Sequence, residues 1–342
     1  MTTRVVLDAM GGDDAPGPVI EGAVAAARNL KRCQVVLVGP EQTIRESLAR
    51  VPNAPQIEIL HAADVIGMHD HATDTIRARP EASINVGLRL VKSGDAHAFV
   101  TAGNTGATMA AALLTLGRVR GISRPALALV YSTPTGKRKL LLDVGANADC
   151  RPLHLIQFAH MGSAFMRGRF TLQSPAVGLL SIGEEDSKGN AVTIEVNEAL
   201  RASQLNFVGN VEGNDILRDT VDITVCDGFA GNILLKTVEG VAETLFAEIR
   251  KAATAKPWNR IAGLMLKPEL RKVRDRLDYS EYGGAQLLGV EGIVVISHGR
   301  SNARAIFNAV RAARDAHEAG ALGLIREVGA TMPARKLDRA ED

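Results

Sequence analysis

The chain has 342 residues, of which 46% are apolar and only 4% aromatic, and its formal net charge is +2. This length suffices for one large α/β domain or two smaller ones, and the composition predicts an aliphatic core. Three widely spaced cysteines, Cys33, Cys150 and Cys226, fit neither a disulfide framework nor a zinc cluster. No apolar run reaches the ~18 residues of a membrane span and no signal-peptide pattern opens the chain, so we expect a soluble protein of a reducing cytosol.

One unit recurs along the chain: a short apolar run, a loop rich in Gly, Asp, Asn or Ser, and a segment with helical periodicity. It occupies residues 4–27, 35–48, 98–114, 140–159, 177–200, 223–245 and 293–310. Alternating strand, loop and helix predicts a largely parallel sheet covered by helices on both faces. The units share a pattern but no sequence, so no solenoid is expected.

The loops after the predicted strands carry most of the polar residues of these units. In open α/β sheets ligands bind at such loops, where helix N-termini offer free N–H groups to anions. Gly11 and Gly12 in MGGDD, and Gly103 and Gly106 in GNTG, allow the backbone to approach a ligand closely. Any one of these loops is explained by a tight turn or a helix start, but several together favour anion binding. Asp8 would repel phosphate, so we expect it to order its loop by hydrogen bonds.

Several common sites are not indicated. The chain has no GxxxxGK[ST] sequence, no GxGxxG after a strand with an acid about 20 residues on, and no GxSxG. Nucleotide binding and a covalent serine or cysteine mechanism therefore have no specific support. His69, Asp70 and His71 invite a metal reading but have no third ligand at a known spacing, so a solvated loop is favoured. We expect neither a metal nor a cofactor.

Eight blocks in chain order together resemble one enzyme family. They are VLDAMGGDDAPGPVIEGA, TAGNTGA, LLDVGANADCRP, LLSIGEEDSKGN, FVGNVEGNDIL, CDGFAGNILLKTVEG, EYGGAQLLGVEGIVVISHG and SNARAIFNAV. From about Val5 to about Arg314 the chain resembles the bacterial fatty acyl-[acyl-carrier-protein]:phosphate acyltransferases of phospholipid synthesis.

The resemblance implies transfer of a fatty acyl group from the acyl carrier protein to inorganic phosphate. It implies a mostly parallel, three-layer α/β/α fold, as in phosphotransacetylase and isocitrate/isopropylmalate dehydrogenase, in which residues 1–342 form one catalytic unit of two intertwined subdomains. It also implies a homodimer, loosely held at the inner face of the cell membrane. A membrane glycerol-3-phosphate acyltransferase is a candidate recipient of the acyl phosphate, and the sequence leaves direct hand-over open.

The residues agree with this chemistry independently. Phosphate attacks a thioester without a protein nucleophile, so the protein must position the anion and stabilise the oxyanion that develops. Lys188, followed by Gly189 and Asn190 at a predicted helix start, is the leading candidate for this contact. The three acids at 184–186 either position its ammonium group or act as N-terminal charges of the helix.

Other strand ends supply further candidates. Asn104 is expected to present amide donors, and Asp227, Asn232 and Lys236 to bind substrate from the CDGFAGN region. His298 either donates a proton to the departing thiolate, orients the phosphate, or is a hydrogen-bonded turn residue. We predict that Lys188, Asn104 and His298 are catalytic.

A basic amphipathic segment covers residues 251–277. Eight basic residues stand against two acidic ones between Lys251 and Arg276, a local charge of +6 in a chain whose total is +2. Pro257 and Pro268 are expected to bracket a short helix. The apolar residues expected to touch a membrane are Trp258, Ile261, Leu264, Met265 and Leu266.

Three interpretations of this segment remain open. It is a helical hairpin buried in the dimer, a tip that contacts anionic lipid, or a docking surface for the acidic carrier protein. The resemblance favours the first two together. Basic residues without interleaved aromatics, outside a nucleic-acid fold, give no support to nucleic-acid binding.

Two other function classes compete with the acyltransferase. A decarboxylating dehydrogenase of the same fold needs a metal-binding acid cluster and a nicotinamide loop, and the chain shows no identifiable nicotinamide loop. A non-catalytic scaffold on a lipid surface would use residues 251–277 but leaves the polar strand-end loops unexplained.

Overall fold

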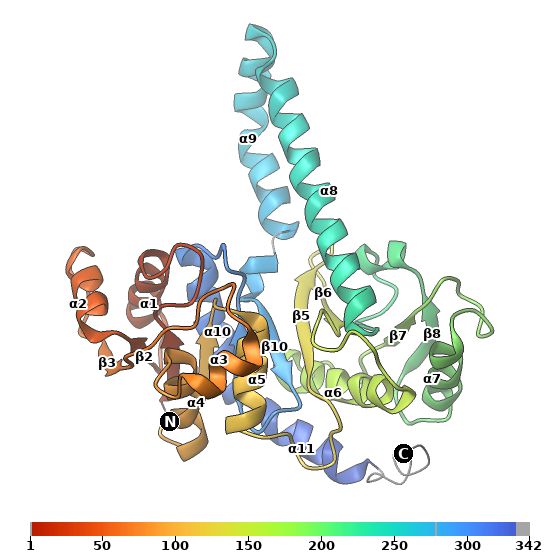
Figure 1. The fold of residues 1–342 in the computed structure, drawn as a ribbon. Helices are drawn as coiled ribbons and strands as arrows, with labels where there is room; N and C mark the ends of the chain where they lie inside the picture. Colours follow the sequence, from red (N-terminus) through yellow and green to blue (C-terminus); the bar gives the residue numbers. More distant parts are fainter. Residues whose placement is uncertain (1, 278, 333–342) are drawn as a thin grey trace.

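The computed structural model describes residues 2–277 and 279–332 (Figure 1). Its eleven strands form one sheet in the order β3-β2-β1-β4-β11-β10-β5-β6-β9-β7-β8. The strands are β1 (Thr3–Asp8), β2 (Cys33–Gly39), β3 (Glu58–His61), β4 (Ala98–Thr101), β5 (Ala126–Ser132), β6 (Arg138–Leu142), β7 (Val177–Leu180), β8 (Phe207–Val211), β9 (Ile223–Val225), β10 (Ala285–Leu288) and β11 (Ile293–Ile296).

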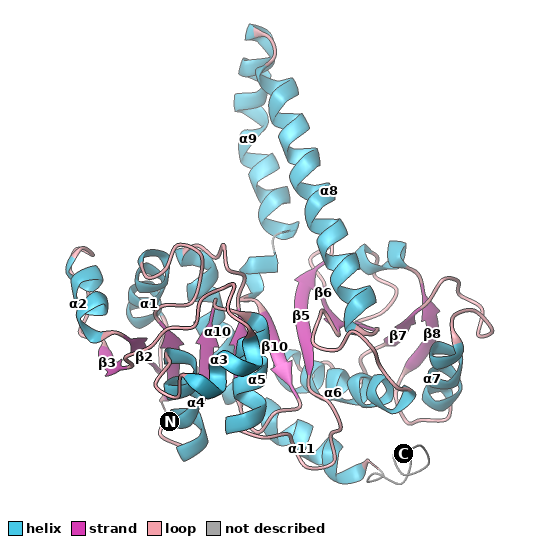
Figure 2. Cartoon of the chain, viewed as in Figure 1, coloured by secondary structure: helices cyan, strands magenta, loops and turns pink. Residues whose placement is uncertain are grey.

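Helices lie on both faces of this sheet, as Figures 1 and 2 show. They are α1 (Gly17–Asn29), α2 (Glu41–Ala49), α3 (Ala72–Ala78), α4 (Ser83–Ser93), α5 (Thr105–Thr115), α6 (Pro152–Phe170), α7 (Ala191–Arg201), α8 (Gly228–Thr254), α9 (Pro257–Leu277), α10 (Ala303–Glu318) and α11 (Ala321–Thr331), with short 3₁₀ turns η1 (Gly213–Leu217) and η2 (Tyr279–Tyr282). The predicted three-layer α/β/α fold is confirmed. Each of the seven predicted units is a strand followed by a helix: β1–α1, β2–α2, β4–α5, β6–α6, β7–α7, β9–α8 and β11–α10.

The sheet consists of two parallel blocks joined by antiparallel strands. One block is β3-β2-β1-β4-β11 and the other is β6-β9-β7-β8, whereas β10 is antiparallel to both β11 and β5, and β5 is antiparallel to β6. The two blocks therefore run in opposite directions along the ladder. Each step between strands adds a twist of about 20–25°, which accumulates to about 150° over the seven steps from β1 to β7. The twist thus turns the carboxyl ends of both blocks toward one side of the molecule.

The core has one hydrophobic cluster on each face of the sheet. Val5 and Leu7 of β1 belong to one cluster and Val6 to the other, and β6 alternates in the same way. Strands buried on both faces are typical of a parallel sheet between two helical layers. Helices α1, α6 and α10 cover the first cluster, and α4 and α5 cover the second.

Helices α8 and α9 form an antiparallel pair, the arm, that projects from the body (Figure 1). Residues 251–277 are therefore the last turn of α8, the connecting turn and all of α9. The expectation that Pro257 and Pro268 bracket a short helix was wrong, because Pro268 lies inside α9. Contacts with α8 hold this helix: Asn259 donates to the carbonyl of Ala252 at 2.9 Å, and an added Cβ on Gly263 would meet Ala253 at 2.9 Å.

None of the helices within the described residues is both long enough and apolar enough to cross a membrane.

Candidate active site

The loops after β1, β4 and β11 pack against one another at the carboxyl edge of the first block. The backbone N–H of Asp13 donates to the carbonyl of Gly299 at 2.8 Å. A Cβ added to Gly11 would stand 2.7 Å from the backbone nitrogen of Gly103, and one added to Gly12, whose φ is +124°, 3.2 Å from the oxygen of Gly299. Glycine is required here because three loops meet at backbone distance. Three glycines predicted to bind substrate, at 11, 12 and 103, thus lie together.

Asn104 is fully engaged within this cluster. Its side-chain oxygen accepts from the backbone N–H of Ala107 at 3.0 Å and so caps α5, and its amide nitrogen donates to the carbonyls of Met68 and Asp70 at 3.1 Å each. An N-cap side chain stabilises a helix start by satisfying a free N–H. Asn104 therefore holds the loop in place, while Gly106, in the first turn of α5, is exposed.

Helix α8 brings two charged side chains to the loop after β11. The ammonium nitrogen of Lys236 lies 3.4 Å from Nε2 of His298 and 2.8 Å from a carboxylate oxygen of Glu239. The side chain of Lys236 is 50% exposed, whereas that of Glu239 is 14% exposed and its second oxygen, Oε1, is buried without a hydrogen bond to any described residue. A lysine from the second block thus meets a histidine from the first.

Partial burial lowers the pKa of His298, and the positive charge of Lys236 lowers it further. Its Nδ1 accepts a hydrogen bond from the backbone N–H of Arg300 at 3.1 Å. An imidazole in this environment is neutral at neutral pH, because both burial and a nearby cation disfavour its charged form. Because Nδ1 accepts the bond from Arg300, the neutral ring carries its proton on Nε2, which suits orientation of an anion by hydrogen-bond donation better than protonation of a leaving thiolate.

The start of α8 rests on the loop that follows β6. The buried carboxylate of Asp143 accepts five hydrogen bonds, at 2.8–3.2 Å, from the backbone of Leu127, Gly145 and Ala146 and from both the backbone and the side chain of Asn147. Burial raises the pKa of Asp143, and these bonds oppose the rise. The carbonyl of Asn147 in turn accepts from the backbone N–H of Gly228 at 2.7 Å.

Two other predicted substrate-binding residues belong to this start of α8. Asp227 caps the helix by accepting from the backbone N–H of Ala230 at 2.7 Å. The exposed side chain of Asn232 faces the loop, since a Cβ added to Gly145 would meet it at 3.7 Å. The structure thus brings Asp227, Asn232 and Lys236 onto one helix, of which Lys236 lies next to His298.

Lys188 lies on a different loop, between β7 and α7. This loop is fixed to the second block: Ser181 donates to the carbonyl of Lys188 at 3.0 Å, and Asn190 caps α7 by accepting from the backbone N–H of Thr193 at 2.9 Å. Gly189 has a φ of +122°, and an added Cβ would stand 2.0 Å from the hydroxyl oxygen of Thr193. The described contacts do not join Lys188 to Asn104 or to His298, although β7 and β9 are neighbouring strands.

Asp186, one of the three acids beside Lys188, has its partners on α7. Asp186 forms an ion pair with Arg201 and accepts a hydrogen bond from Asn197 at 3.2 Å. The hydrogen bond from Arg201 holds the pKa of Asp186 below its ordinary value. Asp186 therefore ties the loop to α7 instead of positioning the ammonium group of Lys188.

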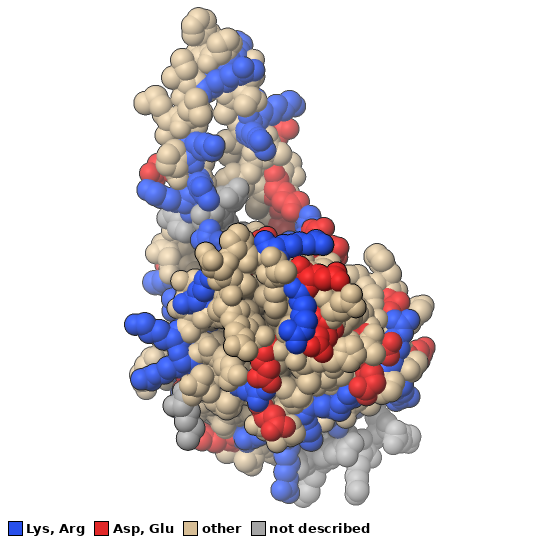
Figure 3. Space-filling view, turned by 90° about the vertical axis from the view of Figure 1, so that its left-hand side faces the viewer, with Lys and Arg blue, Asp and Glu red and all other residues tan. Residues whose placement is uncertain are grey.

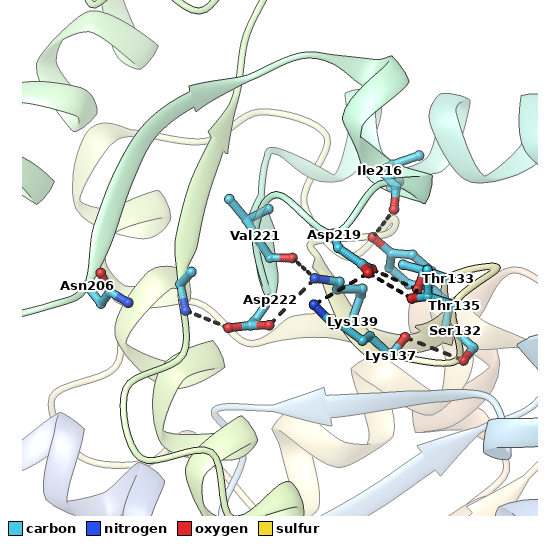
Figure 4. Close-up of polar contacts among 12 residues, drawn as sticks. Ser132, Thr133, Thr135, Lys137, Lys139, Asn206, Ile216, Asp219, Val221 and Asp222 are labelled. Carbon is cyan, nitrogen blue, oxygen red and sulfur yellow. Dashed lines mark hydrogen bonds and ion pairs between the residues drawn. The ribbon is translucent and has the colours of Figure 1, made fainter.

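Sequence reasoning did not identify Glu239, Asp143 or Lys139. Glu239 stands three residues after Lys236 on a helix, a spacing that indicates an ion pair. Lys139 carried no such signal: its side chain is 2% exposed, donates to the carbonyl of Val221 and lies 3.6 Å from Asp222 (Figure 4). It links the β5–β6 hairpin to the segment before β9 and is not available to a substrate.

The remaining polar candidates are structural in the described chain. Asp8 is buried and accepts from the hydroxyl of Thr101 at 2.8 Å and the backbone N–H of Met10 at 3.2 Å, as expected for a loop-ordering residue. Asp70 accepts from the backbone N–H of Gly67 at 3.0 Å and pairs with Arg79 at 3.2 Å. Among the described residues, no three His, Cys, Asp or Glu side chains are placed to hold a metal ion.

Comparison with known proteins identifies a family that this chain matches. The family described as "Fatty acid synthesis protein" matches residues 3–322. A phosphate acyltransferase of Desulfitobacterium hafniense is 46% identical over 331 residues, which cover 96% of this chain and 97% of the relative.

Solved structures share the fold at low identity. The EutD phosphotransacetylase of Staphylococcus aureus aligns over 93% of this chain and 94% of its own, with a TM-score of 0.61 and 15% identity. A branched-chain phosphotransacylase of Enterococcus faecalis aligns over 92% and 99%, with a TM-score of 0.59 and 16% identity. The resemblance carried by the eight sequence blocks is confirmed: the chain belongs to the fatty acid synthesis protein family, in which its relatives at 46% identity are phosphate acyltransferases.

Proposed function

We propose that the chain transfers a fatty acyl group from acyl-[acyl-carrier-protein] to inorganic phosphate, giving an acyl phosphate for phospholipid synthesis. Acyl transfer to phosphate is the activity of its relatives at 46% identity, and the carrier protein as donor is our extension of it. The observation that carries the assignment of the site is the contact between Lys236 and His298. It joins the loop after β11 to the helix after β9, and so places a cation and a neutral imidazole where both parallel blocks end.

The reaction needs few groups from the protein. A phosphate oxygen attacks the thioester carbon, an O–C bond forms, the C–S bond breaks, and the carrier leaves as a thiolate that takes a proton to become the free thiol. Lys236 attracts the phosphate, and N–H groups at the starts of α5 and α8 add donors for it. His298 orients the phosphate by donating a hydrogen bond from Nε2–H.

Lys188 remains our candidate for a second contact with phosphate or with the oxyanion. Its loop leaves β7, which is hydrogen-bonded to β9, the strand that leads into α8. The glycines at 183 and 189 leave little room between the loop and its neighbours, which fixes the backbone on either side of the lysine. Asn104 contributes by holding the glycine loop of α5 in place.

The test follows two products at once. The pure protein is mixed with palmitoyl-[acyl carrier protein], with and without phosphate; free carrier thiol is measured and acyl phosphate is trapped with hydroxylamine. We expect phosphate-dependent release of thiol with an equal amount of acyl hydroxamate. Thiol release without phosphate would instead indicate a thioesterase, and no release would remove the assignment.

Four variants, one of them a control, locate the phosphate. Lys236→Met and His298→Gln are expected to lower kcat/KM for phosphate by about 10²-fold or more, a typical effect of losing a group that stabilises the transition state. Lys31→Met, at an exposed lysine in the turn before β2, is the matched control and should match the wild type. If Lys188→Ala is inactive while Lys236→Met keeps full activity, phosphate is held by the β7 loop and our placement is wrong.

We further propose that the arm forms a homodimer contact along its length and a membrane contact at its end. Val241 and Leu245 lie exposed on α8, and the membrane residues predicted from sequence are also exposed, Met265 at 78%. Figure 3 shows uncharged side chains at the end of the arm, with Lys and Arg below them. Because α8 alone is about 40 Å long, the dimer contact and the tip are well separated.

In this arrangement the two intertwined subdomains of each protomer form one catalytic unit, which lies at the base of the arm. The basic residues of 251–277 attract anionic lipid, at roughly 1 kcal/mol each near the surface. The acyl phosphate product then emerges beside the membrane, where a glycerol-3-phosphate acyltransferase is its natural acceptor. Docking of the acidic carrier protein on the same basic residues is the alternative, and carrier binding that is lost in arm variants would favour it.

A further inference from the structure

A pocket lies on the face of the sheet opposite α8. It has a volume of about 290 Å³, near the lower end for small-molecule sites, and is bounded by α6, α10 and η2 over strands β5, β10 and β11. Its floor residues Ala128, Val130 and Val295 belong to the core cluster covered by α6 and α10, whereas α8 packs on the other cluster. The pocket is therefore distinct from the site at Lys236 and His298.

Three arginines from three separate elements line this pocket: Arg138 of β6, Arg169 of α6 and Arg311 of α10. The guanidinium carbons of Arg138 and Arg169 each lie 5.1 Å from the ring centre of Phe170. This aromatic ring orients two like charges toward the same space, as cation–π contacts do. We call the cavity the arginine pocket.

Few carboxylates neutralise these arginines. Asp315, the one acidic residue of the lining, accepts from Arg169 at 2.7 Å and is shared with Arg314. Arg311 donates to the backbone carbonyl of Glu281 at 3.0 Å, and no ion pair to Arg138 occurs within the described residues. Three arginines against one aspartate give the lining a net charge of +2.

The electrostatic environment of Arg169 agrees with this net positive charge of the lining. Burial lowers the pKa of Arg169, and although Asp315 raises it, the positive charges of Arg138 and Arg311 lower it again. The three cations are thus close enough to repel one another. Bringing like charges together is unfavourable unless an anion joins them.

The position of Arg138 is fixed by its neighbours in the β5–β6 hairpin. Lys137 pairs with Asp219 at 3.4 Å, and the buried Lys139 is bonded to Val221 and Asp222 (Figure 4). With the hairpin held on both sides of Arg138, this guanidinium points into the pocket from a rigid strand. Preorganised donors of this kind bind an anion without a large entropic cost.

We propose that the arginine pocket binds a phosphomonoester whose body is apolar or aromatic. Planar guanidinium groups bind phosphate oxygens in pairs, which explains arginine in preference to lysine at all three positions. The body of the ligand lies against the apolar lining, including Phe165 and Tyr282. The volume excludes a long acyl chain and fits one small ring beside the phosphate.

Isothermal titration calorimetry of the full chain with phenyl phosphate tests the proposal. We expect binding that weakens about tenfold or more in Arg138→Met and in Arg311→Met, since each variant removes a charged hydrogen bond to phosphate. Lys236→Met, on the other face, is the control and should keep this binding. Circular dichroism spectra that match the wild type show that the variants are folded.

Three results would overturn the proposal. In the first, the wild type shows no binding at millimolar phenyl phosphate. In the second, both arginine variants bind phenyl phosphate as the wild type does, while Lys236→Met does not bind it. In the third, inorganic phosphate binds the pocket as tightly as phenyl phosphate, which shows that the pocket does not recognise an apolar body on the ligand. The titration involves no acyl transfer, so its result tests the arginine pocket independently of the proposed enzyme activity.

Discussion

Replacing Asp143 by alanine is expected to destabilise the protein strongly and to displace the site. The carboxylate of Asp143 holds the loop after β6, and this loop supports the start of α8 through the hydrogen bond between Asn147 and Gly228. Alanine removes every one of its hydrogen bonds. Lys236 stands two turns along the same helix, so its position depends on this loop.

The magnitude follows from the donors that are left without a partner. Three of the five bonds, from the backbone N–H of Leu127 and from two groups of Asn147, are buried. A buried donor without a partner costs about 1–3 kcal/mol, so the three together cost about 3–6 kcal/mol when part of the loss is relieved by relaxation. This is a large fraction of a typical stability of 5–15 kcal/mol. For a chain of this size we expect the melting temperature to fall by roughly 4–8 °C.

Urea unfolding followed by far-ultraviolet circular dichroism measures the change. Asp149→Ala, at an exposed position in the same loop, is the matched control and should lie within about 0.5 kcal/mol of the wild type. Asp143→Asn keeps one acceptor oxygen, so its loss should fall between the two. If Asp143→Ala unfolds at the same urea concentration as Asp149→Ala, the carboxylate does not hold the loop after β6 in place and the reasoning is refuted.

Three further predictions concern the site, the arm and the hairpin. Lys236→Met removes a cation that lowers the pKa of His298, so this pKa should rise. A proton NMR titration of the imidazole that gives an unchanged pKa contradicts this prediction. Replacing Leu264 and Leu266 together by Glu should abolish sedimentation with anionic liposomes, by loss of about 1.5–3 kcal/mol for each buried leucine, while soluble activity is kept; unchanged sedimentation removes the membrane contact. Lys139→Ala should lower stability by about 2–4 kcal/mol in urea unfolding, since a buried chain and its hydrogen bond are both lost, and wild-type stability would show that the hairpin is held by other contacts.

Much of the fold was predictable because its signals are local. Apolar runs, glycine loops and helical periodicity indicated seven strand–helix units, and all seven are present. The antiparallel strands β5 and β10 were not among them. Four-residue strands such as β10 carry too little periodicity to fix a direction, which is decided by pairing with strands distant in sequence.

The candidate site was predictable in part for the same reason. Loop composition selected Asn104, Asn190 and Asp227, but each side chain caps a helix, a role for which the same residue types are preferred. Residue type alone therefore cannot separate a cap from a ligand-binding group. Lys188 and His298 were grouped by chemistry, and the described contacts connect His298 to Lys236 instead.

The sequence by itself determined the layered architecture, the polar strand ends, the basic arm and the family, because each depends on neighbouring residues or on blocks of sequence in a fixed order. Only the tertiary structure decided which strand ends meet. Lys236 and His298 are 62 positions apart and belong to blocks that run in opposite directions along the sheet. They come together because the sheet turns by about 80–100° over the four steps from β11 to β9, and because α8 carries Lys236 two turns beyond the end of β9. Twist is a property of the paired strands as a whole. The arginine pocket has the same origin, since its three arginines come from three elements that meet only when the sheet is complete.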